Sequence, residues 1–135
     1  KTRLSWFEES ILHFKKQSII FLDPDNGLQK NIKIKKKSLK HLNIEEVKGY
    51  LTNGKTVIYT QFQSFNKHHR IYLREIINLF KENGILINLP IIRNRTSPNT
   101  FYITITHDKL ISKDLKQIYK EYSIMRKEYI DLITI

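Results

Sequence analysis

The chain has 135 residues, of which 40% are hydrophobic and 11% aromatic; this is long and apolar enough for a folded core and excludes a wholly disordered chain. It contains no cysteine, which excludes disulfides, thiolate metal sites and a cysteine nucleophile. The 24 Lys and Arg residues outnumber the 13 Asp and Glu residues, and the resulting net charge of +11 favours a polyanionic partner such as nucleic acid.

The sequence predicts a single α/β domain over residues 1–135, because it shows no internal repeat and no linker. It opens with Lys1 rather than Met, which is compatible with a fragment of a longer chain. No apolar stretch approaches the roughly 20 residues of a membrane span, so we expect no membrane partner. The lack of cysteine is compatible with a reducing compartment, and we expect a cytoplasmic protein.

The N-terminal residues predict a helix and then a buried strand. Ser5 and Glu8 have the spacing of a capping box, so we expect a helix over residues 5–17 with Trp6 on its core-facing stripe. Residues 18–22 contain four consecutive apolar residues, two of them β-branched, which is typical of a central strand buried on both faces.

A turn with acidic side chains follows this strand. Pro24 lacks an amide hydrogen and restricts Asp23 to extended conformations, and Asn26-Gly27 tolerates a positive φ. Ligands bind at the carboxyl edge of the strands in open α/β sheets, so we assign Asp23, Asp25 and Asn26 to a candidate catalytic site. In the alternative interpretation, Asp23 only caps the amides of its own turn.

The segment after the turn is rich in lysine, with six lysines and no acidic residue between residues 29 and 41. A basic block of this kind attracts polyanions whatever their sequence. We predict phosphate contacts from four of these residues: Lys33, Lys35, Lys36 and Lys37. In the alternative interpretation they form a solvated surface that reflects a general bias toward lysine.

Periodicity and capping patterns predict six further elements. They are a short helix from Asn43 to Gly54, a strand at 56–62, a long helix at 68–83, strands at 85–92 and 101–106 that pair as an antiparallel hairpin, and a final helix from residue 112. The alternation of helices and strands predicts a mostly parallel sheet flanked by helices, with a terminal antiparallel hairpin. This is a Rossmann-like half domain.

A second group of polar residues follows the strand at 56–62. If this strand runs parallel to the one at 18–22, its carboxyl end lies beside the Asp23 turn. We therefore propose His69 as a catalytic base and Gln61, His68 and Arg70 as substrate-binding residues. Alternatively, the histidines are solvent-exposed residues of the first helical turn.

The element order and the string from Phe21 to Leu28 resemble the second half of a class I S-adenosylmethionine-dependent methyltransferase. In that family the fourth strand ends in an Asp/Asn-Pro motif, followed by a helix, a strand, a helix and an antiparallel hairpin. Asp23 and Pro24 match the motif of the amino-methylating members, whereas Asp25 and Asn26 stand where those members have proline and an aromatic residue. The chain is also similar to bacterial and phage proteins that carry the same Phe-Leu-Asp-Pro-Asp-Asn-Gly-Leu string.

The resemblance implies S-adenosylmethionine as cofactor, although the usual glycine-rich binding loop is absent from this sequence. The four glycines include no Gly-x-Gly pair. The hypotheses at this point are a methyltransferase-like domain that acts on or binds nucleic acid, a cofactor-free nucleic-acid-binding domain, and a metal-dependent nuclease using Asp23 and Asp25. In each case, Arg93 and Arg95 are further candidates for phosphate contacts. We assign no metal site, because no third carboxylate is evident.

Overall fold

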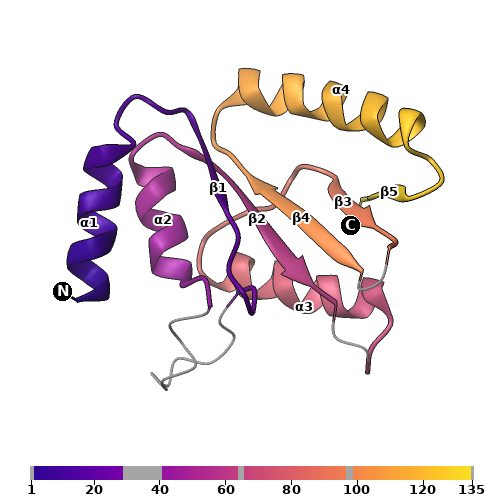
Figure 1. The fold of residues 1–135 in the computed structure, drawn as a ribbon, viewed down its shortest axis with the longest axis horizontal. Helices are drawn as coiled ribbons and strands as arrows, with labels where there is room; N and C mark the ends of the chain where they lie inside the picture. Colours follow the sequence, from indigo (N-terminus) through magenta and orange to yellow (C-terminus); the bar gives the residue numbers. More distant parts are fainter. Residues whose placement is uncertain (1, 29–40, 64–65, 97–98, 135) are drawn as a thin grey trace.

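The computed structural model describes residues 2–28, 41–63, 66–96 and 99–134, which form five strands and four helices (Figure 1). In chain order the elements are α1 (Arg3–His13), β1 (Ile19–Leu22), α2 (Ile44–Thr52), β2 (Thr56–Phe62), α3 (His69–Glu82), β3 (Ile91–Asn94), β4 (Thr100–Ile105), α4 (Lys109–Met125) and β5 (Ile130–Ile133). None of the helices in the described ranges is long and apolar enough to cross a membrane.

The strands form one mixed sheet in the order β1-β2-β4-β3-β5. Only β1 and β2 are parallel, and the other three pairs are antiparallel. The α/β class and the β3–β4 hairpin are confirmed, whereas the prediction of a mostly parallel sheet is wrong. The reason is that β4 returns between β2 and β3, so that these two co-directional strands are separated by an antiparallel one.

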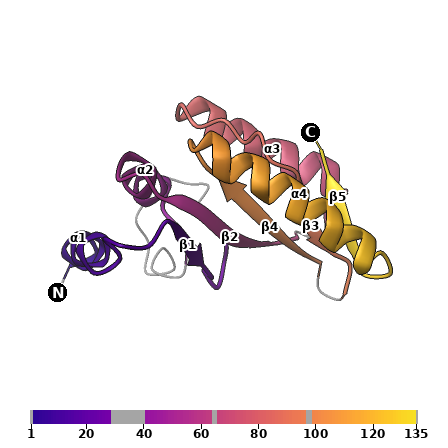
Figure 2. The ribbon, with the colours of Figure 1, turned by 90° about the horizontal axis from the view of Figure 1, so that it is seen from above.

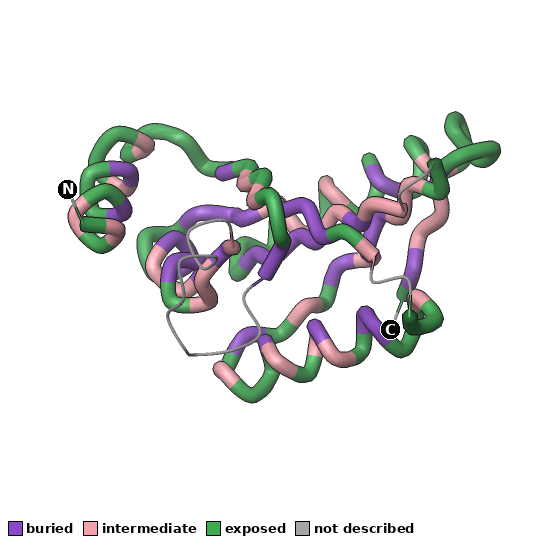
Figure 3. The backbone as a smooth tube through the Cα atoms, turned by 60° about the horizontal axis from the view of Figure 1, so that its bottom comes forward, coloured by how far each residue is buried: buried purple, intermediate pink, exposed green. Residues whose placement is uncertain are grey.

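Helices cover both faces of the sheet, but unequally (Figures 1 and 2). On one face, α2 and α3 pack on the central strands; the buried side chains here include Leu51, Leu73, Ile76, Phe80, Phe101 and Ile103. Phe7 of α1 joins the same face through Ile20 and Val57. On the opposite face, Tyr119 of α4 packs against Ile92 and Ile130 of β3 and β5. Figure 3 shows the buried stretches running through the middle strands, with the N-terminal helix mostly exposed.

The first strand differs from its prediction. β1 lies at the edge of the described sheet and pairs only with β2. Ile20 is buried, but Ile19 and Phe21, which point to the other face, are 44% and 56% exposed. That face of β1 is open because α4 packs on the β3–β5 end of the sheet. The prediction of a central strand buried on both faces is therefore wrong.

Several element boundaries also differ. The capping box of Asn43 and Glu46 is confirmed, but α1 begins after Thr2, whose hydroxyl accepts the Ser5 amide, so Ser5 is not the cap. Of the predicted strand at 85–92, only the last two residues belong to β3, because Pro90 lacks the amide hydrogen that a ladder requires. The final helix ends at Met125, and the chain then adds β5, which was not predicted.

Candidate functional site

The Asp23–Gly27 turn wraps around the carboxyl end of β2. The Gly27 amide donates to the Pro24 carbonyl over 3.2 Å, and Gly27 has a φ of 68°. On one side of the turn, the Asp23 carboxylate accepts the Thr60 hydroxyl at 2.6 Å. The turn follows β1 directly, so the parallel pairing of β1 and β2 places it at their shared carboxyl edge, as the sequence predicts.

Gln61 holds the other side of the turn. Its side-chain oxygen accepts the Leu28 amide at 2.9 Å, and its nitrogen donates to the Tyr72 hydroxyl at 2.6 Å. The residue is buried, and both ends of its amide are engaged within the fold. Gln61 therefore connects the turn to α3, and we assign it a positioning role.

A cavity of about 580 Å³ adjoins this turn. Its lining comes from the start of α1, the turn and the start of α2: Thr2, Arg3, Trp6, Leu22, Asp23, Pro24, Asp25, His41, Leu42 and Glu46. Asp23 and Asp25 are both exposed residues of this lining, whereas the exposed Asn26 is not part of it. This volume lies within the range of small-molecule sites.

An ion pair joins α1 to α2 in the wall of this cavity. The Arg3 guanidinium donates to both carboxylate oxygens of Glu46, at 2.5 and 2.9 Å, and to the His41 carbonyl at 2.6 Å. The hydrogen bond to Glu46 raises the pKa of Arg3. These two charges compensate each other, so among the described residues of the lining Asp23 and Asp25 carry the remaining formal charge.

Trp6 lines this cavity, and its predicted position in the core is wrong. We predicted it on the core-facing stripe of the first helix, but its side chain lies on the cavity and is 51% exposed. Adjacent residues of a helix point about 100° apart, so Trp6 and Phe7 cannot both face the sheet. Phe7 is the one that does so, because it packs with Ile20 of β1 and Val57 of β2.

The histidines do not join the turn. His68 is the N-cap of α3, where its ring accepts the Arg70 amide at 3.3 Å. The pKa of His69 is lowered, first by burial and then by Arg93, His68 and Arg70, while the negative charge of Asp131 opposes this effect. His69 thus lies toward β3 and β5, and no contact in the described residues connects it with Asp23.

The predicted phosphate-binding residues are engaged elsewhere or lie outside the described part of the chain. Arg93 and Arg95 both donate to the Asp131 carboxylate, at 3.4 and 3.0 Å, and Arg95 also donates to the Lys127 carbonyl. These contacts tie β3 to β5 and to the end of α4. The predicted contacts from Lys33, Lys35, Lys36 and Lys37 fall outside the described residues.

Comparison with family models, with curated proteins and with solved structures gives no match for this chain. Within the described ranges, no three His, Asp or Glu side chains gather so that they could hold a metal ion. The chemistry of the site itself is therefore the basis for a functional proposal.

Proposed function

We propose that the protein binds nucleic acid and that the cavity beside the Asp23 turn receives an unpaired nucleobase. The observation that supports this most directly is that the half-exposed indole of Trp6 lines the same cavity as two exposed carboxylates. An aromatic face stacks on any base, with about 1–3 kcal/mol per base. Carboxylates accept hydrogen bonds from the exocyclic amino groups of bases.

The charge distribution favours the base, rather than the phosphate, as the occupant. The chain as a whole carries +11, which favours association with a polyanion. Among the described residues that line the cavity, however, Arg3 is paired with Glu46 and the two turn carboxylates are exposed. A phosphate would meet these carboxylates as like charges, whereas an amino-bearing base would meet them as acceptors.

Trp6 makes the proposal directly measurable, because it is the only tryptophan in the chain. Titration with short single strands of adenine or cytosine should quench its fluorescence, and a thymine strand, which lacks an exocyclic amino group, should bind more weakly. Trp6→Ala should weaken binding of a labelled adenine strand by about 5- to 150-fold, which corresponds to the stacking energy of one base.

Tyr129→Ala is the matched control, because Tyr129 is exposed to almost the same extent but does not line the cavity. It should leave the affinity unchanged. Unaltered fluorescence in every titration, together with equal affinities of the two variants, would contradict the proposal.

A second candidate is the methyltransferase-like function, which the element order favours. Residues from β1 to β4 follow the order strand, helix, strand, helix and antiparallel hairpin, with an Asp-Pro turn after the first strand, as the resemblance implies. The described residues contain no Gly-x-Gly loop that would fit S-adenosylmethionine, and we derive no step through this cofactor. Calorimetric titration with S-adenosylmethionine tests the candidate: saturable heat would favour it, and the absence of heat would favour base binding without cofactor.

A further inference from the structure

Four lysines form a row on one side of α4. Lys109, Lys113, Lys116 and Lys120 follow one another at intervals of four, three and four residues, which returns each to the same side of a helix. At 1.5 Å per residue the row is about 16 Å long. We call these four residues the α4 lysine row.

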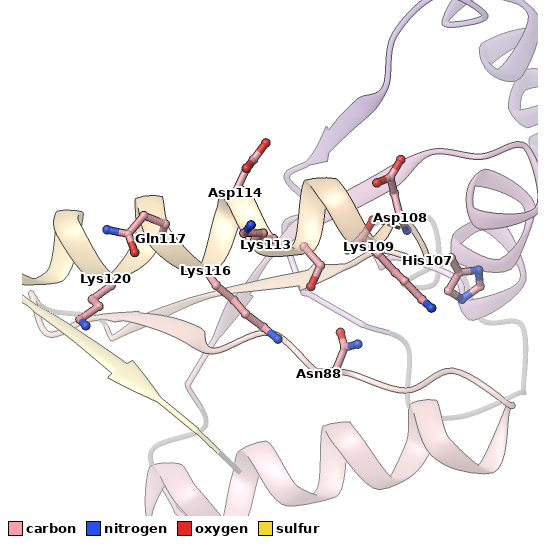
Figure 4. Close-up of a pocket in the computed structure, with 11 residues that line it drawn as sticks. Asn88, His107, Asp108, Lys109, Lys113, Asp114, Lys116, Gln117 and Lys120 are labelled. Atoms are coloured by element: carbon pink, nitrogen blue, oxygen red, sulfur yellow. Dashed lines mark hydrogen bonds between the residues drawn. The ribbon is translucent and has the colours of Figure 1, made fainter.

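The row borders a cavity of about 690 Å³ between α4 and the chain before β3. Asn88 lines the opposite side, and Ser112 and Gln117 add further polar groups. Figure 4 shows Lys109, Lys116 and Lys120 extending from α4 on the side where Asn88 lies. The cavity therefore offers several cationic and neutral donors to one ligand.

The described lining of this cavity contains four lysines and only two acidic residues, so its formal charge stays positive. Asp108 is the N-cap of α4, and its carboxylate accepts the Leu110 and Ile111 amides at 2.9 and 3.0 Å. Asp114 also belongs to the lining, and Figure 4 shows its side chain extending from α4 on the side opposite Asn88. Within the part of the chain that the structure describes, none of the four lysines is in an ion pair.

We propose that the α4 lysine row binds the phosphodiester backbone of nucleic acid. This inference rests on the proposed function and deepens it, because it places the phosphates on a surface distinct from the base cavity. A row of point charges matches a chain of repeating phosphates, whereas a single small anion would need donors that converge on one point. Lysines lack the planar fork of arginine, so the contact should position the strand without reading its sequence.

The experiment compares two charge-matched variants in which four lysines are replaced by glutamine. One carries the substitutions in the α4 lysine row, and the control carries them at Lys15, Lys16, Lys81 and Lys127, which are also exposed. Anisotropy of a labelled thymine strand is measured at several salt concentrations. Each phosphate contact contributes about −0.7 to the slope of log affinity against log salt for a single strand.

We expect the α4 variant to flatten this slope by about 3 and to weaken binding by a factor on the order of 100 at moderate salt. The control should change both quantities much less. Equal changes in the two variants would overturn the proposal, because net charge alone would then account for binding. Circular dichroism of both variants verifies that the helix is retained.

The design separates this inference from the proposed function. If adenine strands still quench Trp6 while the α4 variant keeps the parent slope, the lysine row is excluded and the base cavity stands. If no oligonucleotide binds the parent protein, both proposals fall. Competition with inorganic polyphosphate and with vesicles containing anionic lipid tests other sources of phosphate. If either competitor binds the row but the thymine strand does not displace it, the backbone assignment is wrong.

Discussion

Replacement of Gly27 by alanine is expected to destabilise the protein by about 3 kcal/mol. Gly27 has a φ of 68°, a left-handed conformation that costs an L-residue about 1–2 kcal/mol. An added Cβ would also lie 2.4 Å from the Gln61 side-chain nitrogen. Gln61 would have to move away from Leu28 or Tyr72, and a buried polar group that loses its partner costs about 1–3 kcal/mol.

Two other glycines provide the control for this prediction. Gly54 and Gly84 have φ values of 74° and 77°, but a Cβ added at either meets no atom within 4 Å. Alanine at these positions should therefore cost only the conformational part of the free energy, about 1–2 kcal/mol. Urea unfolding of the three variants measures the difference, and equal free energies of unfolding would contradict the close approach of Gln61 to the turn.

A double variant tests whether the rest of the stability loss in Gly27→Ala, beyond its conformational part, comes from the clash with Gln61. Gln61→Ala alone should be destabilising because it leaves the buried Leu28 amide without its acceptor. When Gly27→Ala is added, the clash no longer exists, so the combined loss should be smaller than the sum of the single losses. This coupling would show that Gln61 determines the shape of the turn that presents Asp23 and Asp25.

Local patterns in the sequence were sufficient for the turn, for the bounds of β2 and for the start of α2. The bounds of β2 agree with the predicted residues 56–62, and the Asn43–Glu46 capping box predicts the start of α2. Both follow from interactions over a few residues. The position of β1 at the sheet edge does not, since it depends on which strands pair across long stretches of chain.

The candidate site was predicted in part for the same reason. The parallel β1–β2 pair brings the Asp23 turn to the end of β2, where Gln61 contacts the residues that follow. His69, at the start of α3, instead lies near Arg93 of β3 and Asp131 of β5. Strand direction predicts the edge at which a residue emerges, but not how far the next helix carries it along that edge.

Trp6 and the α4 lysine row illustrate a different limit. Trp6 was predicted on the core-facing stripe of the first helix, and the final helix was predicted only from residue 112, which left Lys109 outside it. The side of a helix that borders a cavity depends on the elements packed beside it, here the turn for α1 and the chain at Asn88 for α4.

Replacement of Glu46 by alanine is expected to destabilise the protein by about 3 kcal/mol and to weaken base binding. Its carboxylate accepts two hydrogen bonds from Arg3, and Oε2 also accepts the Asn43 amide at 3.4 Å as part of the capping box. Removing one partner of a buried ion pair costs about 3–5 kcal/mol, and the partial exposure of Arg3 places the expected value at the lower end. Chemical unfolding measures the loss.

Glu45→Ala separates this contact from a general effect of charge. Glu45 is the preceding residue, and its ion pair within the described residues is with Lys48, on the surface of the same helix, so its removal should cost no more than about 0.5 kcal/mol. Glu46→Gln retains an acceptor for the cap but removes the charge, so its stability should lie between those of the parent and Glu46→Ala. Equal stability of Glu45→Ala and Glu46→Ala would show that the Arg3 pair contributes little.

The same variants connect stability with the proposed site. Arg3 and Trp6 lie on the first turns of α1, and the Arg3–Glu46 contact fixes that end of the helix against α2. When the carboxylate is removed, the indole should lose its position beside the Asp23 turn. Under conditions where Glu46→Ala remains folded, quenching of Trp6 by an adenine strand should therefore require higher concentrations than in Glu45→Ala. If quenching is the same in both variants, the end of α1 is held in place by the packing of Phe7 on Tyr50, and the ion pair is dispensable for base binding.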